Sequence, residues 1–516
     1  MFHSPIGCPI GSLWVFIFVM RLVIVFIYVA LFSQKIGAQV GFSHPHDFGQ
    51  LAIGWGSIVL SNDTVTIFGA IHENTQPAFG LLFSQFDTSG NLLQYTVYND
   101  PMEDNVVRVF PNSFIKLANN EGYAGIGGIF ERVFGFFILY DNEGSVQKVV
   151  EYPDDILQDY YIEIVEVSDG FFILGNKQKN NYHQDIFLMK TDKEGNKLWE
   201  KSYGHPTREN FYGSVVKVND NEYVIGGATT TIPMMPQLVP NTSNFYIIDS
   251  LGTLKSSWQS QPSVTDRGVT YGMQRTEQGG WIYATTEGRF EPPVNVFESK
   301  LKLIERDSEY NIINEKAYGN FRPNNIQQNF KKLSNSDYLM VGTRSIQFSS
   351  QTQYPSLNMG SLLRISPTGD SIWNFLDTAF GLAQNRIYDA VELPSGSIIA
   401  CGYSQTLNPP KDWGWLVKVS KDGCVDTFNC FPMSSVGDFM MEQQIKVYPN
   451  PTSDFIYLDL PESEQSEYQI LDLSGNLIKS GVVSDSKIST YLLPTGGYVL
   501  KVRSKNGIFV KKIIKI

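Results

Sequence analysis

The sequence predicts an all-β protein in which a long repeat region precedes a small β-sandwich. Turns that contain Gly recur at regular intervals from residue 40 to residue 430, and short stretches of alternating apolar and polar residues flank them. Such alternation is typical of strands, and Gly supplies the positive φ that tight hairpins require. A last segment of about seventy residues holds seven or so further short strands.

The repeat is clearest in residues 185–230, which hold two hairpins with turns at residues 192–196 and 219–221. The first turn recurs, once without Gly at residues 308–311, and otherwise at Gly90, Gly144, Gly195, Gly252, Gly369 and Gly423. The second hairpin recurs at residues 65–69, 122–127, 171–175, 223–226, 281–284, 338–342 and 398–402. Each hairpin therefore occurs seven times.

Successive first turns lie about 51 to 60 residues apart, which leaves room for four short strands. Repeated four-stranded units predict a β-propeller, because each blade buries its apolar faces only against its neighbours. We expect a seven-bladed β-propeller with four-stranded blades at residues 40–430. The copy that begins at Asp185 also resembles the Asp-x-x-Gly-Asn-x-x-Trp-x-x-x-Tyr-Gly propeller repeats of secreted bacterial proteins.

The expected blade order places the tight turns on one face of the ring and the long connections on the other. Loops that vary in length on a rigid scaffold commonly carry binding sites. We therefore expect a polysaccharide or protein ligand on the loop-rich face. The long connections span residues 72–79, 230–244, 289–298, 347–360 and 405–412.

Four motifs follow in order at the C-terminus. They are Pro449-Asn450-Pro451, residues 468–475 with Asp472 and Gly475, residues 493–498 with Pro494, Gly496 and Tyr498, and the apolar, Lys-containing end at residues 510–516. Ile456 and Leu458 alternate with Tyr457, as in a strand with one buried face. Motifs in this order resemble the type A C-terminal sorting domain of the Bacteroidetes type IX secretion system.

This resemblance implies a small Ig-like β-sandwich at residues 444–516 whose partner is the type IX secretion machinery. It also implies export through the periplasm to a secreted or surface-attached state. By the same resemblance, the domain would be removed by cleavage in or near a linker at residues 431–443.

The N-terminal segment agrees with export. Read from Met20, the chain has a basic residue at Arg21, an apolar stretch to Phe32 and small residues before Gln39 that suit cleavage. We expect a signal peptide at residues 1–38, with Met20 as an alternative start. The competing interpretation is a retained transmembrane anchor, which the C-terminal sorting signal argues against.

Three cysteines follow the expected signal peptide. Cys424 and Cys430 are close in sequence and form a candidate disulfide in an oxidising extracytoplasmic compartment. Cys401 lies in an apolar strand and has no second Cys close to it in sequence. We therefore expect its side chain to be buried and to pack as a small apolar group.

The formal net charge of −12 excludes the positively charged surface that nucleic-acid binding requires. No stretch of the mature body resembles a membrane span. His44, His46 and Asp47 could hold a metal, although a solvated loop is the simpler interpretation. The Asp-rich turns lack the further carboxylates of a calcium site. We assign no metal site and no cofactor.

No catalytic residue is assigned either. The carboxylates Asp154, Asp155, Glu163 and Glu166 are expected on solvated turns and strand faces. Trp413 and Trp415 could stack on a sugar, but we expect them to pack between blades.

The sequence thus favours a non-catalytic binding or surface-adhesion module. The alternative is an extracellular hydrolase or lyase that acts on polysaccharide or peptide at the propeller centre. Several carboxylates, or a His with carboxylates, at the ring centre would favour the enzyme.

Overall fold

The computed structural model describes residues 41–48, 51–73, 79–99, 107–129, 134–153, 158–180, 183–206, 208–230, 241–263, 268–269, 272–291, 296–322, 325–346, 357–377, 383–407, 410–425, 446–459, 466–471, 477–483, 485–504 and 507–516. These residues form 36 β-strands. Among them, no helix has the length and apolar character needed to cross a membrane. The expected signal peptide and linker lie outside the described residues.

Four sheets each consist of four consecutive antiparallel strands. They are β2 (Leu51–Ser61), β3 (Thr64–Glu73), β4 (Phe79–Asp87) and β5 (Leu92–Asn99); β11 (Gln158–Val167), β12 (Gly170–Asn180), β13 (His183–Thr191) and β14 (Lys197–Tyr203); β15 (Asn210–Asn219), β16 (Glu222–Thr230), β17 (Asn241–Asp249) and β18 (Leu254–Gln259); and β19 (Met273–Arg275), β20 (Trp281–Glu291), β21 (Val296–Arg306) and β22 (Ile312–Arg322). The all-β prediction is confirmed.

Two further sheets vary this pattern. In a five-stranded sheet, β6 (Val107–Arg108) and β7 (Phe114–Lys116) both pair with β8 (Tyr123–Ile129), which is followed by β9 (Phe134–Tyr140) and β10 (Val146–Tyr152). An eight-stranded sheet contains β23 (Ile326–Lys332), β24 (Tyr338–Ile346), β25 (Leu357–Ile365), β26 (Ser371–Asp377), β27 (Ala383–Glu392), β28 (Ile398–Leu407), β29 (Pro410–Val419) and β1 (Phe42–His46). Its two four-stranded parts meet at a parallel bridge between Asn358 and Gln384.

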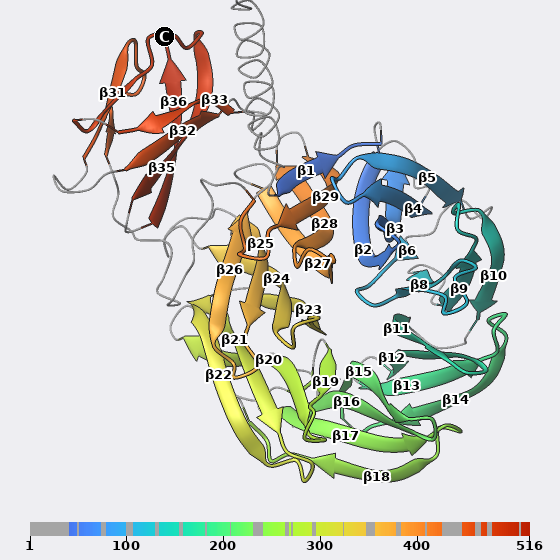
Figure 1. The fold of residues 1–516 in the computed structure, drawn as a ribbon. Helices are drawn as coiled ribbons and strands as arrows, with labels where there is room; N and C mark the ends of the chain where they lie inside the picture. The colour runs from blue at the N-terminus through green and yellow to red at the C-terminus, as the bar shows by residue number, and fades with distance from the viewer. Residues whose placement is uncertain are drawn as a thin grey trace, which may run out of the picture.

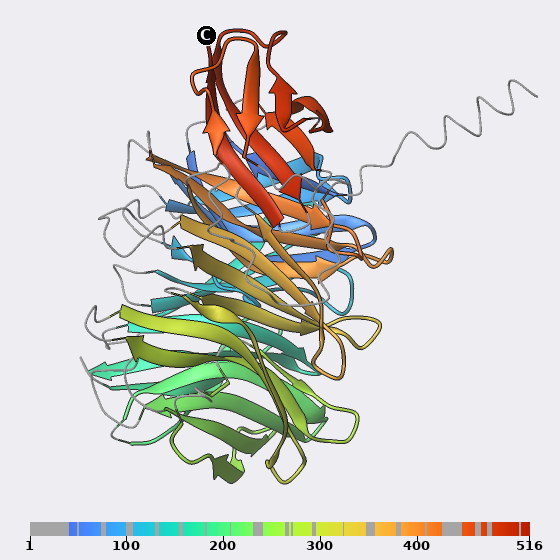
Figure 2. The same ribbon diagram turned by 90° about the vertical axis from the view of Figure 1, so that its left-hand side faces the viewer.

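Six of the sheets follow one another around a ring, with β2, β11, β15, β19, β23 and β27 toward its centre (Figure 1). Figure 2 shows from the side how successive sheets are stacked. The ring closes where β1 pairs with β29, from Phe42 opposite Lys418 to His46 opposite Gly414. This pairing covers the edge of β29, which would otherwise expose unpaired backbone groups.

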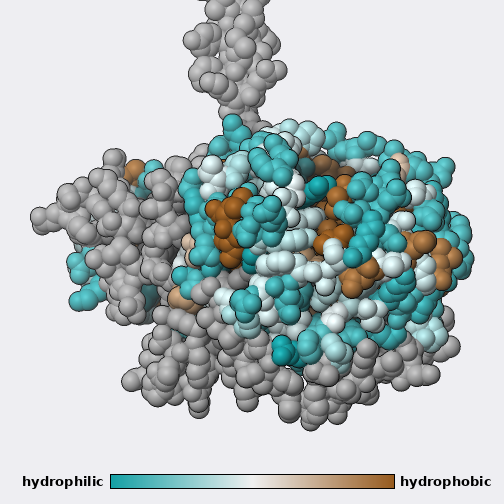
Figure 3. Space-filling model, turned by 90° about the horizontal axis from the view of Figure 1, so that it is seen from below, coloured by the Kyte–Doolittle hydropathy of each residue, from teal (hydrophilic) through white to brown (hydrophobic). Residues whose placement is uncertain are grey.

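The apolar core lies between neighbouring sheets. In one cluster, Phe172 and Leu188 of one sheet pack against Val215 and Ile225 of the next. On the outer strands, apolar side chains such as Leu198 stay exposed. The face shown in Figure 3 is mainly hydrophilic with separate hydrophobic spots. Packing between sheets therefore stabilises the ring more than packing at its rim does.

The repeated turns have the geometry that the sequence predicts. Gly195 has a φ of +80°, and in the copy without Gly, Tyr310 has a φ of +67°. Positive values also occur at Gly90, Gly144, Gly252, Gly369 and Gly423. The Asp192 carboxylate accepts hydrogen bonds from the backbone N–H groups of Glu194 and Asn196. The Asp at the start of the motif thus fixes the turn while Gly supplies the conformation.

The repeat motif also links one sheet to the next. The hydroxyl of Tyr203 on β14 donates a hydrogen bond of 2.7 Å to the carbonyl of Gly252, in the turn between β17 and β18. Tyr318 makes the same contact with Gly369 at 2.7 Å. The Tyr-Gly end of one copy therefore holds the turn of the following copy.

The C-terminal segment forms two small sheets. One contains β30 (Val447–Tyr448), β31 (Phe455–Leu458) and β34 (Lys487–Ser489), and the other contains β33 (Leu477–Val482), β32 (Glu467–Leu471), β35 (Gly496–Ser504) and β36 (Gly507–Lys515). Ile456 and Leu458 are buried while Tyr457 is exposed, as the alternation predicts. Ile456 of the first sheet and Ile470 of the second share one apolar cluster.

Candidate functional site

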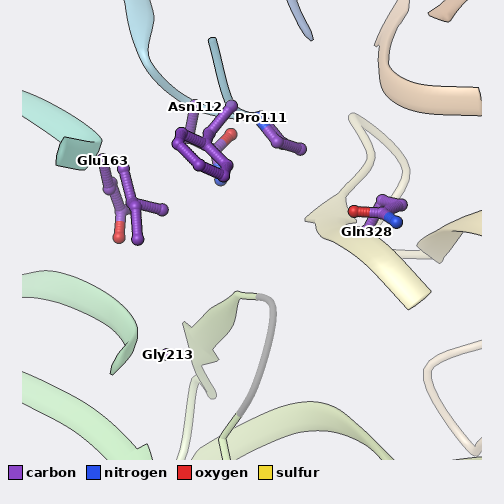
Figure 4. A pocket seen from close by; sticks show the side chains of 7 residues that line it. Pro111, Asn112, Glu163, Gly213 and Gln328 are labelled. Atoms are coloured by element: carbon purple, nitrogen blue, oxygen red, sulfur yellow. The ribbon is translucent and has the colours of Figure 1, made fainter. Parts of the chain in front are cut away.

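A cavity of about 190 Å³ lies at the innermost strands of the ring (Figure 4). Ile162 and Glu163 come from β11, Gly213 from β15 and Gln328 from β23. Residues 110–112, just before β7, complete the lining with Phe110, Pro111 and Asn112. Four different sheets therefore contribute to this one site.

A shared backbone irregularity places polar side chains at this centre. The innermost strands β2, β11, β15, β23 and β27 each contain a β-bulge. A bulge bends its strand and re-aims the side chain that follows it. The residues that resume the pairing are Ser57, Glu163, Ser214, Asn329 and Asp389.

Glu163 is the ionisable residue in the cavity lining. Its carboxylate accepts hydrogen bonds from Ser214 Oγ at 3.2 Å and from the Val215 backbone N–H at 3.0 Å. Burial raises the pKa of Glu163 to about 7, because the ionised carboxylate loses solvation, although the two hydrogen bonds and the Lys331 charge oppose this shift. Glu163 is half-buried and lines the cavity, so the expectation of a solvated strand face holds only in part, since the bulge turns its side chain toward the ring centre.

Asp389 occupies the corresponding position on β27 and is 1% exposed. Its Oδ2 accepts hydrogen bonds from Ser57 Oγ and the Ile58 N–H, both at 3.2 Å. Its Oδ1 lies 2.5 Å from Lys331 Nζ and accepts a 2.8 Å hydrogen bond from Asn329 Nδ2. This carboxylate is therefore held in place by several donors and a cation.

A second cavity, of about 540 Å³, lies further along the innermost strands, toward their C-terminal ends. Its lining consists of Ile58, Val59, Leu60, Ile115, Lys116, Lys331, Lys332, Leu333, Leu339, Ala390, Val391 and Glu392. Hydrogen bonds and an ion pair connect Asn112 through Asn329 and Asp389 to Lys331. This polar chain thus runs from the lining of one cavity to the lining of the other.

The sequence reasoning did not single out Asn112, Asn329 or Asp389. A signal was available in the repeat, because a polar residue stands before an apolar one in Ser57-Ile58, Ser214-Val215 and Asn329-Phe330. Alignment of the innermost strands would have placed these polar residues at one level of the ring.

The His-rich N-terminal segment is a strand and not a solvated loop, which corrects the expectation. The His46 ring packs against Trp55 and Phe86, with centroids 5.5 and 4.9 Å away. Burial, with a smaller effect of the His44 charge, lowers the pKa of His46 to about 4. Asp47 pairs with Lys411 at 2.6 Å. Among the described residues, no group of three or more His, Cys, Asp or Glu side chains could hold a metal ion.

The packing predictions are confirmed for Cys401 and for Trp415, while Trp413 is only half-buried. Cys401 is 0% exposed in an apolar cluster of the core. Trp415 is also 0% exposed, and its Nε1 donates a hydrogen bond to Ser43 Oγ on β1. Trp413, two residues earlier, lies under Lys411 Nζ, which is 4.1 Å from its ring centroid.

Several other predictions lie outside the described residues. Cys424 is buried, but Cys430 is outside, so their bridge stays a prediction. Asp154 and Asp155 also lie outside, while Glu166 accepts a hydrogen bond from the Ala118 N–H. Much of the expected long connections lies outside as well, at residues 74–78, 231–240, 292–295, 347–356 and 408–409.

The C-terminal motifs meet in space although they are separate in sequence. The Asn450 side chain accepts a 2.8 Å hydrogen bond from the Ile514 N–H, between the first motif and the last strand. Thr452 pairs with Lys515, and the Thr452 N–H donates to the Ile514 carbonyl. Tyr498 donates to the Pro494 carbonyl at 2.8 Å, within the third motif. Asp472 and Gly475 lie outside the described residues.

The fold and these motifs define an exported protein with a propeller-like ring and a C-terminal sorting domain. Residues 446–516 match the family described as the secretion system C-terminal sorting domain. This domain directs the protein through the type IX machinery to secretion or attachment at the outer surface, as the motifs predicted. The comparison with curated proteins gave no match.

Solved structures give distant likenesses. A neuraminidase-like protein from A/bat/Guatemala/164/2009 is 10% identical with a TM-score of 0.36, and the match covers 74% of this chain and 95% of that chain. A structure of BBS1N in complex with ARL6DN is 8% identical with a TM-score of 0.36 and coverages of 74% and 97%. A structure from an analysis of two prolyl endopeptidases is 9% identical with a TM-score of 0.38 and coverages of 88% and 54%.

Proposed function

We propose that this protein is an exported seven-bladed β-propeller that acts as a non-catalytic binding or surface-adhesion module. Six sheets form the ring, and the eight-stranded sheet divides into two four-stranded units once β1 is included. The ring therefore has seven blade-sized units, which supports the blade count. The propeller would occupy residues 40–430. An Ig-like β-sandwich at residues 444–516 would deliver it.

The observation that carries the binding role is the chemistry of the ring centre. Most glycosidases need two carboxylates that flank the scissile bond. The described lining of the smaller cavity offers one carboxylate, Glu163. The nearby Asp389 carboxylate is engaged by Lys331, Asn329 and the Ser57 hydroxyl. A cavity with one available carboxylate and two amide side chains is better suited to recognition than to hydrolysis.

One observation favours the alternative, a hydrolase or lyase that acts on polysaccharide or peptide. A carboxyl group with a pKa near 7 is suited to general acid–base catalysis at neutral pH, and Glu163 has such a pKa. The enzyme would then use Glu163 as its acid or base.

Binding and turnover can be separated with the mature protein collected from the cell surface or the medium. We expect binding on an array of glycans and peptides, without products in a hydrolysis screen of the bound compounds. Turnover that disappears in Glu163→Gln would replace the binding role with the enzymatic one.

The sorting-domain resemblance adds a processing step. We propose that the domain is cleaved in or near residues 431–443 and that Cys424 is bridged to Cys430. Intact-mass measurement of surface material tests the first point, because a species that still ends at Ile516 contradicts it. Complete alkylation of both thiols without reductant contradicts the second.

A further inference from the structure

Two innermost strands carry the same arrangement around a carboxylate. Asp389 accepts from Ser57 Oγ and the Ile58 N–H, and Glu163 accepts from Ser214 Oγ and the Val215 N–H. In both cases the donors are a Ser that follows a bulge and the next backbone N–H, on the next sheet around the ring. The ring thus holds two versions of one carboxylate site.

The two versions differ in what completes them. Asp389 is paired with the Lys331 ammonium group at 2.5 Å and accepts further hydrogen bonds from Asn329 Nδ2 and the Ala390 N–H. Among the described residues, the hydrogen-bond donors to Glu163 are Ser214 and Val215. A buried carboxylate requires a cation or several donors to offset its lost solvation.

We propose that the cavity beside Glu163 binds the primary ammonium group of a small ligand, in the role that Lys331 has at Asp389. This inference rests on the proposed binding function and names its ligand chemistry. The ligand ammonium would approach the Glu163 carboxylate between its two protein donors. The amide side chains of Gln328 and Asn112, both in the lining, would offer hydrogen-bond partners to the rest of the ligand.

The cavity limits the size of that ligand. About 190 Å³ holds an aliphatic amine with a short stem or one amino-sugar ring, and Phe110, Pro111 and Ile162 offer apolar contact to either. Aliphatic amines and amino sugars share the ammonium chemistry and differ in shape, so separate arms of the experiment distinguish them.

The proposal carries a pH dependence. Within the part of the chain that the structure describes, Lys331 is the charged group that acts on Glu163 from a neighbouring element, and it is paired with Asp389. An alkylamine such as n-butylamine stays protonated across the neutral range, as the Lys side chain does. Ionisation of Glu163 through a pKa of about 7 should therefore raise the affinity for an alkylamine roughly tenfold between pH 6 and pH 8. An amino sugar should show a smaller pH effect, because its own ammonium group loses its proton in this range.

The test is calorimetric titration of the full mature protein with n-butylamine and with glucosamine at pH 6 and pH 8. The matched neutral ligands are 1-butanol and N-acetylglucosamine. We expect n-butylamine to bind with the tenfold pH effect or glucosamine to bind with a smaller one. The matched neutral ligand should bind at least tenfold more weakly, and Glu163→Gln should lose the amine preference. A thermal melt of each variant establishes that it is folded.

The proposal fails if neither amine binds the wild-type protein at either pH, or if the neutral ligands bind equally well. Equal amine binding by folded Glu163→Gln also overturns it. Because the wild-type pH series needs no variant, a misfolded Glu163→Gln would not remove the test. Array binding that is indifferent to amines and to Glu163 would sink this inference while leaving the proposed binding function intact.

Discussion

The side chains of Asn112 and Asn329 exchange hydrogen bonds across the centre of the ring. Asn329 Nδ2 donates to Asn112 Oδ1 at 2.9 Å, and Asn112 Nδ2 donates to Asn329 Oδ1 at 3.2 Å. The two residues are 217 positions apart in sequence. Asn329 also donates to Asp389 and accepts from the Phe330 N–H, so one amide joins three parts of the centre.

We expect Asn329→Ala to lower the free energy of unfolding by about 2 to 3 kcal/mol, because buried donors and acceptors lose their partner. Urea unfolding measures this loss. Gln328→Ala, at the neighbouring residue that lines the cavity, is the matched control and should cost less than about 1 kcal/mol. Equal stability of Asn329→Ala and wild type would show that the central network contributes nothing.

Tyr203→Phe should cost about 1 kcal/mol, because it removes the hydrogen bond to the Gly252 carbonyl and little else. Tyr318→Phe removes the equivalent bond to Gly369, and the costs should add in the double variant because the pairs are separate. Tyr95→Phe, at a residue of the ring that is 47% exposed, serves as the control. If denaturant titration gives the same free energy of unfolding for the three single variants, the two tyrosine hydroxyls do not help to join the sheets.

Gly195→Val should cost on the order of 1 kcal/mol or more, because a residue with a Cβ is strained at a φ of +80°. A Cβ there would also overlap the Phe137 ring. Gly279→Val has a similar φ of +83°, but its nearest neighbour would be an Arg275 side chain at 3.8 Å. Thermal unfolding should therefore show the larger loss for Gly195→Val, and the reverse order would exclude the overlap as a cause.

Glu163 should make stability depend on pH in a defined window. Its pKa rises from 4.5 in the unfolded chain to about 7 in the fold, so the native state binds more protons between these values. Stability from this group is present below pH 4.5 and is lost as the pH rises through 7, with a total of at most about 3 kcal/mol.

The measurement is urea unfolding of wild type and Glu163→Gln at pH 4.5 and pH 7.5. The wild type should lose stability relative to the variant as the pH rises. A difference that stays constant across this window means that the Glu163 carboxyl has an ordinary pKa in the fold.

Removal of residues 444–516 should leave the ring folded in the periplasm, because no sorting signal would engage the secretion machinery. Fractionation with an antibody to the ring measures this outcome. Asn450→Ala is a milder variant, since it removes the contact with the Ile514 N–H and should weaken export in proportion to its effect on the domain. A truncated chain that still reaches the medium would contradict the sorting role.

Local patterns in the sequence determined the strands, the repeated turns and the sorting motifs. Alternation and Gly position are short-range signals, so Gly195 and Tyr457 behave as predicted. The same reasoning placed Trp415 and Cys401 in the core, because an apolar residue on a buried strand face needs no knowledge of its distant neighbours.

Only the tertiary structure decided how the ends of the ring meet and what occupies its centre. Phe42 pairs with Lys418, and Asn112 meets Asn329, through contacts between residues far apart in sequence. The bulge before Glu163 turned a residue expected in solvent toward a cavity. Strand periodicity cannot specify these features, because they arise when distant strands are brought to one centre and each buried polar group must find a partner.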